Sequence, residues 1–318
     1  MKRLLIGIVI CAAVIGIVFS VFTILKNPER RLTQTYLYDA SIFTNAAELP
    51  AAYVETARIP STDPELRGVA VGPGDHIYSV GTFLTVTSSN GTQVYRVPLA
   101  APATCVAVSD NGTIYIGMTD HIECYDATGG FLSAWTSLGS TAIVTSIALA
   151  LPDVYAADAG NRVVVRYDDT GNVRTLIGQK NTEHGIPGFV VPSPYFDVAV
   201  GTDNSLWVVN PGLHEFENFA RDGTLRTAWQ RRGLGLDGFC GCCNPSHMAI
   251  QPDGSIVTAE KAIARVKICE PDGALRCLVA GPDQFAEGTV GLDVAVDSHG
   301  QILVLDPVAR AIRIFTQR

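Results

Sequence analysis

Pairs of short apolar segments, each pair joined by a polar turn, recur along most of the chain. The first segment of each pair centres on an alanine, and the turn is rich in glycine, aspartate and asparagine, as a tight β-hairpin requires. The pairs recur roughly every 40 to 50 residues. They begin at Gly68, Cys105, Ser146, Asp197, His247 and Asp293. The alternation predicts two strands in each of six repeats.

A third and a fourth strand follow in most repeats. In four of them an acid or amide closes the second segment, and a large or soft residue follows nine positions later. These pairs are Asp158 with Tyr167, Asn210 with Phe219, Glu260 with Cys269, and Asp306 with Phe315. Four-stranded units at this period are typical of propeller blades. The sequence therefore predicts an all-β fold, a six-bladed β-propeller of four-stranded blades.

The last repeat is one strand short, because the chain ends at Arg318 after the third strand. The segment "AYVETARI", residues 52–59, has strand character and precedes the first repeat. We expect it to supply the missing outer strand, since closing the ring removes two exposed sheet edges. The predicted propeller domain spans residues 52–318.

An uncharged apolar stretch lies before the propeller. Residues 4–25 are long enough to cross a bilayer as one helix, and no signal-peptide cleavage site is evident. We expect residues 1–31 to form an N-terminal membrane anchor with its flanks, and residues 32–51 to form a stalk. Because short N-terminal tails usually stay in the cytoplasm, we expect a single-pass protein with its propeller on the extracytoplasmic side.

The rest of the chain is acidic. Beyond residue 31 it carries 18 lysines and arginines against 30 aspartates and glutamates. Such a surface repels phosphate backbones, so nucleic acid is excluded as the expected partner.

The repeats resemble those of NHL-repeat propellers. "VYAADAGNRVVVRYDDTGNV", residues 154–173, is similar to that family's second and third strands. "GLGLDGF" followed by "NPSHMAIQPDGSIVTAE" is similar to its lead into an inner strand. The resemblance implies a six-bladed propeller and leaves the activity open, because such propellers include protein-binding modules and, more distantly, peptide-amidating lyases and strictosidine-synthase-like enzymes. The chain departs from the pattern by inserting "CGCC", residues 240–243.

Three polar residues are predicted to converge at the mouth of the central channel. The first positions of the six repeats should form one ring at its rim, and Asp197, His247 and Asp293 come from consecutive blades. Two long loops, residues 178–195 and 230–246, should lie on the same face, and the first carries His184. Loops on a rigid scaffold often bind ligands. Asp197, His247, Asp293 and His184 are therefore the candidate ligand-binding residues.

The cysteine cluster leaves three interpretations open. Cys240, Cys242 and Cys243 together with His247 would supply sulfur and imidazole ligands suited to zinc or copper, with the two aspartates orienting the histidine. Outside the cytoplasm, disulfides are an equal alternative, such as a bridge between Cys242 and Cys243. The third alternative is that the thiols stay free.

The chain contains no nucleophile elbow, phosphate loop, HExxH or EF-hand motif. "GLGLDG" has the glycine spacing of a dinucleotide-binding loop without the βαβ context that such a loop needs. The first hypothesis is therefore a binding or scaffold module that presents its loop-rich face to a protein or small molecule. The alternative is a metal-dependent lyase or hydrolase with its site at the same channel mouth.

Overall fold

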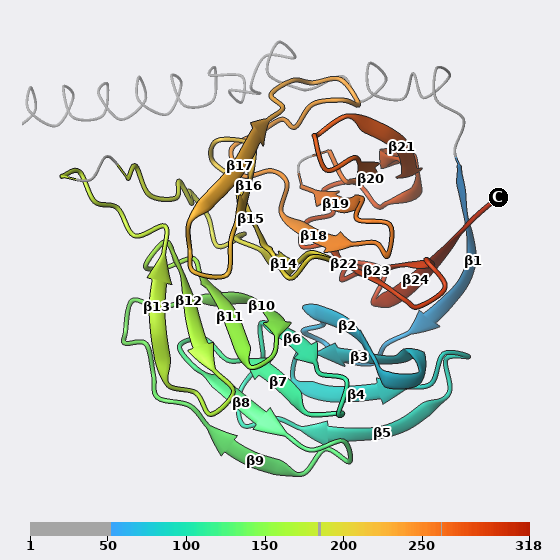
Figure 1. The fold of residues 1–318 in the computed structure, drawn as a ribbon. Coiled ribbons are helices and arrows are strands. Elements are labelled where there is room, and N and C mark those ends of the chain that lie inside the picture. The colour runs from blue at the N-terminus through green and yellow to red at the C-terminus, as the bar shows by residue number, and fades with distance from the viewer. Residues whose placement is uncertain (1–51, 184–185, 262) are drawn as a thin grey trace, which may run out of the picture. The chain divides into compact units, whose positions relative to one another are not determined.

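The structure is a computed structural model, and it describes residues 52–183, 186–261 and 263–318. Six four-stranded antiparallel sheets surround a central channel (Figure 1), so the prediction of a six-bladed propeller is confirmed. The first three sheets are β2 (Gly68–Gly72), β3 (His76–Val80), β4 (Phe83–Thr87) and β5 (Gln93–Pro98); β6 (Cys105–Val108), β7 (Ile114–Gly117), β8 (Ile122–Tyr125) and β9 (Phe131–Ala134); and β10 (Val144–Ala150), β11 (Asp153–Asp158), β12 (Val163–Asp168) and β13 (Val173–Ile177).

The last three sheets have the same order from the channel outward. They are β14 (Val198–Val200), β15 (Leu206–Asn210), β16 (Glu215–Phe219) and β17 (Leu225–Gln230); β18 (His247–Ile250), β19 (Ile256–Glu260), β20 (Arg265–Cys269) and β21 (Leu275–Ala280); and β22 (Asp293–Val296), β23 (Ile302–Asp306), β24 (Ala311–Gln317) and β1 (Tyr53–Pro60). We number these sheets as blades 1 to 6. The innermost strand of each blade lies beside the channel (Figure 1).

Strand β1 completes blade 6. It pairs antiparallel with β24, in a register that runs from Tyr53 opposite Gln317 to Pro60 opposite Ala311. The segment before the first repeat is thus the outer strand of the last blade. The Arg313 side chain on β24 reinforces the pairing, because its Nη2 lies 2.6 Å from Oε2 of Glu55 on β1.

The outer hairpins of the blades turn on short polar motifs. In blade 3, the Asp168 carboxylate accepts hydrogen bonds from the backbone N–H groups of Thr170 and Asn172. Gly171 has φ of 89°, a left-handed conformation that glycine adopts without steric cost. The same polar residues that marked the turns in the sequence therefore fix the hairpins.

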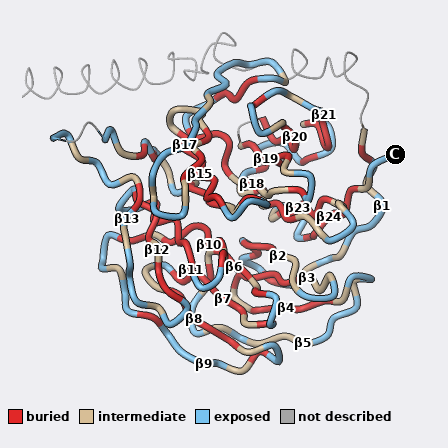
Figure 2. The backbone as a smooth tube through the Cα atoms, viewed as in Figure 1, coloured by how far each residue is buried: buried red, intermediate tan, exposed pale blue. Residues whose placement is uncertain are grey.

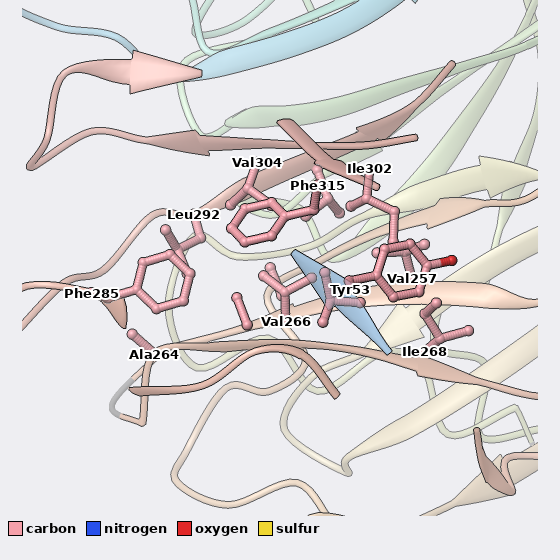
Figure 3. Close-up of a cluster of buried hydrophobic side chains, with 14 of the residues drawn as sticks. Tyr53, Val257, Ala264, Val266, Ile268, Phe285, Leu292, Ile302, Val304 and Phe315 are labelled. Carbon is pink, nitrogen blue, oxygen red and sulfur yellow. The ribbon is translucent and has the colours of Figure 1, made fainter. Parts of the chain in front are cut away.

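The core lies between neighbouring blades. The middle strands are mostly buried, and β15 is buried along its whole length, whereas β9 on the outside exposes all four of its residues. Figure 2 shows the buried backbone concentrated toward the channel. One cluster joins blades 5 and 6 and includes Tyr53, Val266, Phe285 and Phe315 (Figure 3). Each blade therefore uses both faces of its sheet for packing.

In blades 3 and 4, the acid or amide that closes the second strand is hydrogen-bonded to the loop that leads into the inner strand. We call these segments the lead-in loops. In blade 3, Oδ1 of Asp158 accepts hydrogen bonds from the backbone N–H groups of Ile143 and Asn161. In blade 4, Oδ1 of Asn210 accepts one from Val190 N–H. These bonds fix the lead-in loops around the channel mouth.

The predicted membrane anchor and stalk, residues 1–31 and 32–51, lie outside the described residues. Within the part of the chain that the structure describes, no helix is long and apolar enough to span a membrane.

Candidate functional site at the channel mouth

Five of the six predicted first positions line the channel, and Gly68 of blade 1 is not among its lining residues. Cys105, Ser146, Asp197, His247 and Asp293 all line the central channel, which has a volume of about 300 Å³. Asp197 directly precedes β14, and the other two polar residues of the predicted trio begin β18 and β22. The shared register of the repeats brings them together from three blades.

The His247 imidazole faces both carboxylates. Its Nδ1 lies 3.4 Å from Oδ1 of Asp293 and 3.8 Å from Oδ2 of Asp197. The three side chains are mostly buried, with exposed fractions of 14% for His247, 15% for Asp293 and 6% for Asp197. We call these three residues the acid–histidine cluster.

The two carboxylates also connect adjacent blades. Asp197 accepts a hydrogen bond from Met248 N–H in the next blade, and Asp293 accepts one of 2.8 Å from Val69 N–H across the closure of the ring. Ser146 has the same position in blade 3, and its hydroxyl donates to Val198 O at 3.3 Å. These residues therefore stabilise the ring of inner strands in addition to flanking the histidine.

Burial changes the acidity of both carboxyl groups. It raises the pKa of Asp197 to about 6, although the His247 imidazole opposes this shift, and it raises the pKa of Asp293 as well. A carboxyl group that titrates near neutral pH beside an imidazole can exchange protons with a bound molecule.

A cavity of about 520 Å³ opens above the cluster. We call it the mouth cavity. Its walls include residues from the lead-in loops of blades 1, 2, 3, 4 and 6, and blade 5 contributes His247, which is shared between this cavity and the channel. The wall is largely apolar, with Leu66, Ile143, Tyr195 and Val290 among its residues, and it also contains the Glu65–Arg67 ion pair. Volume and lining are typical of sites for small organic ligands.

Sequence reasoning missed three further residues beside this cavity. The Tyr195 ring meets the His247 ring edge-on, with centroids 6.2 Å apart. Lys261 Nζ lies 4.4 Å from the centroid of the Tyr195 ring and donates a 2.8 Å hydrogen bond to Oγ of Ser193. Tyr195 and Ser193 come from one long loop, and Lys261 comes from the β19–β20 turn, so no sequence spacing links them.

The inserted cysteines lie on the other long loop. Cys240 packs against Ile263, Cys242 is exposed, and Cys243 is fully buried. Asn244 anchors the loop, because its Nδ2 donates to Lys261 O at 2.8 Å and its Oδ1 accepts from Lys261 N–H at 2.9 Å. The insertion therefore folds onto the β19–β20 turn.

A buried charge cluster holds the start of this loop. The Arg265 guanidinium makes a bidentate pair with Glu260, at 2.6 and 2.9 Å, and Lys267 Nζ lies 3.1 Å from the same carboxylate. All three side chains are at most 1% exposed. Lys267 and Arg265 also donate to Gly238 O, and Lys267 donates to Leu236 O at 2.9 Å. This cluster fixes the path of the chain into the cysteine insertion.

The metal hypothesis requires Cys240, Cys242, Cys243 and His247 to converge. The described residues contain no group of three or more His, Cys, Asp and Glu side chains placed to hold a metal ion. Instead, the Cys243 sulfur accepts a 2.8 Å hydrogen bond from the Ser193 hydroxyl, while the histidine faces the two aspartates. His184, the fourth candidate ligand residue, lies outside the described residues.

The seven cysteines of the described part are free thiols. The Cys242 and Cys243 sulfurs are 3.6 Å apart, farther than the S–S bond length of roughly 2 Å.

A second cavity, of about 660 Å³, lies beside the other long loop. Arg162, Leu176 and Phe189 are among its lining residues. It contains no residue of the acid–histidine cluster, so we take the mouth cavity as the candidate site.

No protein-family model and no curated protein matches the sequence. Solved structures do match the fold. A streptogramin B lyase has a TM-score of 0.60 at 11% identity, over 84% of this chain and 98% of that chain. A protein of unknown function from Bacteroides thetaiotaomicron has a TM-score of 0.60 at 16% identity, over 86% of this chain and 74% of that one.

A third match is virginiamycin B lyase from Staphylococcus aureus. A catalytically inactive histidine-to-alanine variant of that enzyme, determined with quinupristin, has a TM-score of 0.57 at 13% identity and covers 84% of this chain and 100% of that one. At these identities the likeness concerns the fold alone. The NHL repeat itself stays a prediction, and the chain has the fold of a six-bladed propeller similar to the streptogramin B lyases.

Proposed function

We propose that this chain is a membrane-tethered, extracytoplasmic propeller that binds a small organic molecule in the mouth cavity. One observation carries the proposal: a cavity of about 520 Å³ is walled by residues from all six blades and has His247 at its inner end, against two carboxylates. Few polar groups in a mainly apolar cavity are the usual design of a small-molecule site.

The lining indicates the chemistry of the ligand. Leu66, Ile143 and Val290 suit an apolar body, and Tyr195 offers an aromatic face. The cluster at the inner end has two carboxylates for one imidazole, so it favours a protonated amine or another hydrogen-bond donor. The expected ligand is an apolar molecule with one cationic or donor group.

Calorimetric titration of the full chain in detergent micelles tests this. The probes are tryptamine and its isosteric alcohol tryptophol, which differ in the charged group. We expect tryptamine to bind about tenfold more tightly than tryptophol, the equivalent of about 1.4 kcal/mol. Asp293→Asn should abolish that preference because it removes a carboxylate charge, and His247→Ala should weaken tryptamine binding because it removes the side chain at the inner end of the cavity.

His121→Ala is the matched control. This histidine also lies between two carboxylates, with Nδ1 2.7 Å from Oδ1 of Asp120 and Nε2 3.6 Å from Oε1 of Glu123. It belongs to blade 2 and does not line the mouth cavity. If neither probe binds, or if His121→Ala and His247→Ala weaken tryptamine binding equally, the proposal is wrong.

The second candidate function is a lyase. It is favoured by the His247–Asp197 contact, since burial raises the pKa of Asp197 to about 6, close to the working range of a general acid or base. The fold likeness to virginiamycin B lyase, which a histidine-to-alanine change inactivates, points to the same chemistry. Chromatography of quinupristin incubated with the chain tests it: conversion by the wild type and not by His247→Ala would support a lyase, and no conversion would reject it for this substrate.

The membrane part of the proposal depends on residues 4–25 alone. Protease added to intact cells should digest the propeller if it lies outside the cytoplasm. Full protection until the cells are lysed would place the propeller on the inner side.

A further inference from the structure

Adjacent thiols with unequal exposure lie on the loop that carries the cysteine insertion. The Cys242 and Cys243 sulfurs are 3.6 Å apart. Among the seven cysteines of the described ranges, Cys242 is the exposed one, and the remaining six are buried. A soluble reagent therefore reaches Cys242 first, with a second thiol already beside it.

The buried thiol is held by a chain of hydrogen-bond donors. Lys261 Nζ donates to Ser193 Oγ, and the Ser193 hydroxyl donates to the Cys243 sulfur, each at 2.8 Å. A donor chain that begins at an ammonium group stabilises negative charge on the sulfur at its end. Burial raises the pKa of the Cys243 thiol, and this hydrogen-bond chain opposes that shift.

The donor chain is rigidly placed. The backbone N–H and C=O groups of Lys261 are both hydrogen-bonded to the side chain of Asn244, the residue that follows Cys243. The Lys261 ammonium is also seated over the Tyr195 ring, 4.4 Å from its centroid. The lysine, the serine and the two cysteines therefore keep a fixed relation to one another.

We propose that Cys242 and Cys243 form a thiol–disulfide exchange pair that reacts with low-molecular-weight disulfides. Cys242 receives the external sulfur, and Cys243 resolves the mixed disulfide. The pair is distinct from the proposed ligand site, so either can fail without the other.

The reaction balances without a further reagent. The Cys242 thiolate attacks one sulfur of a disulfide RSSR, which breaks the S–S bond and releases one RSH with the proton from Cys242. The Cys243 thiolate then attacks the Cys242 sulfur, and the second RSH leaves with the proton from Cys243. The two cysteines lose two electrons and become a disulfide, and RSSR is reduced to two thiols.

The test uses the folded full chain and oxidised glutathione. After incubation and acid quenching, alkylation and peptide mass spectrometry count the remaining thiols. We expect the wild type to lose two thiols and to carry no bound glutathione. Cys243→Ser should stop at one glutathione on Cys242. A wild type that keeps glutathione on Cys242, or that loses no thiols, would overturn the proposal.

Cys240→Ser identifies the partner, because Cys240, Cys242 and Cys243 lie in one tryptic peptide. The proposed pair still loses two thiols in this variant, whereas a bridge to Cys240 would not form. Lys261→Met removes the ammonium and keeps the length of the stem. We expect it to slow the second step about tenfold, about 1.4 kcal/mol in the barrier, at an unchanged melting temperature. An unchanged rate would remove the donor chain from the mechanism.

Discussion

Glu260→Gln should be among the most destabilising single substitutions in blade 5. The change keeps the size of the side chain and removes the only carboxylate within the group formed by Glu260, Arg265 and Lys267. Two buried cations then remain without a counter-charge. Breaking a buried ion pair by removal of one partner costs about 3 to 5 kcal/mol. Burial already lowers the pKa of Lys267, so its ammonium depends on the neighbouring carboxylate.

The assay is equilibrium urea denaturation followed by fluorescence of the three tryptophans. Glu270→Gln is the matched control in the same blade. Glu270 pairs with Arg276 at 2.7 Å, but the two side chains are 38% and 34% exposed, so its loss should cost less than about 1 kcal/mol. If both substitutions reduce the free energy of unfolding equally, the buried charge cluster does not hold the loop as described.

Three further predictions concern the ring and the site. Tyr53→Ala removes the aromatic side chain that β1 buries between blades 5 and 6, and should lower the free energy of unfolding in urea by about 3 to 5 kcal/mol. A loss no greater than that of Val54→Ala, at an exposed position of the same strand, would contradict the closing role of β1. Since burial raises the pKa of Asp197 to about 6, the folded protein binds this proton more tightly than the unfolded chain, and stability should fall as the pH rises from about 4 to 6. In Asp197→Asn, the free energy of unfolding should lose up to about 3 kcal/mol of this change between pH 4 and 6. If the free energy of unfolding varies with pH in the same way in the wild type and the variant, the prediction is wrong. Asp158→Ala leaves two backbone N–H groups unpaired and should lower the free energy of unfolding by about 1 to 3 kcal/mol. If Asp169→Ala, at an exposed neighbouring position, costs as much, the Asp158 hydrogen bonds do not stabilise the blade.

The fold was predictable because each blade is encoded locally. Alternating apolar residues and polar hairpin turns are visible in every repeat, and the incomplete last repeat pointed to residues 52–59 as the closing segment. The convergence of Asp197, His247 and Asp293 followed from the same register. What the register did not reveal is that both aspartates also bond backbone N–H groups of the next blade.

The arrangement of the loops was not predictable in this way. Ser193 and Tyr195, from one long loop, contact Lys261 on the β19–β20 turn, and Asn244 fastens the other long loop to the same turn. Such contacts have no sequence period. Closeness in sequence suggested that the cysteines and His247 would form one metal site. In the structure, the Cys243 sulfur accepts a hydrogen bond from the Ser193 hydroxyl.

The central claim is that the mouth cavity is the ligand site, and anomalous diffraction from crystals soaked in bromotryptamine tests it most directly. The account predicts a bromine peak within the cavity lined by Leu66, Tyr195 and Val290, with the amine toward His247. The peak should disappear in His247→Ala crystals. A peak in the cavity beside Phe189 instead, or no peak at all in the wild type, would contradict the account.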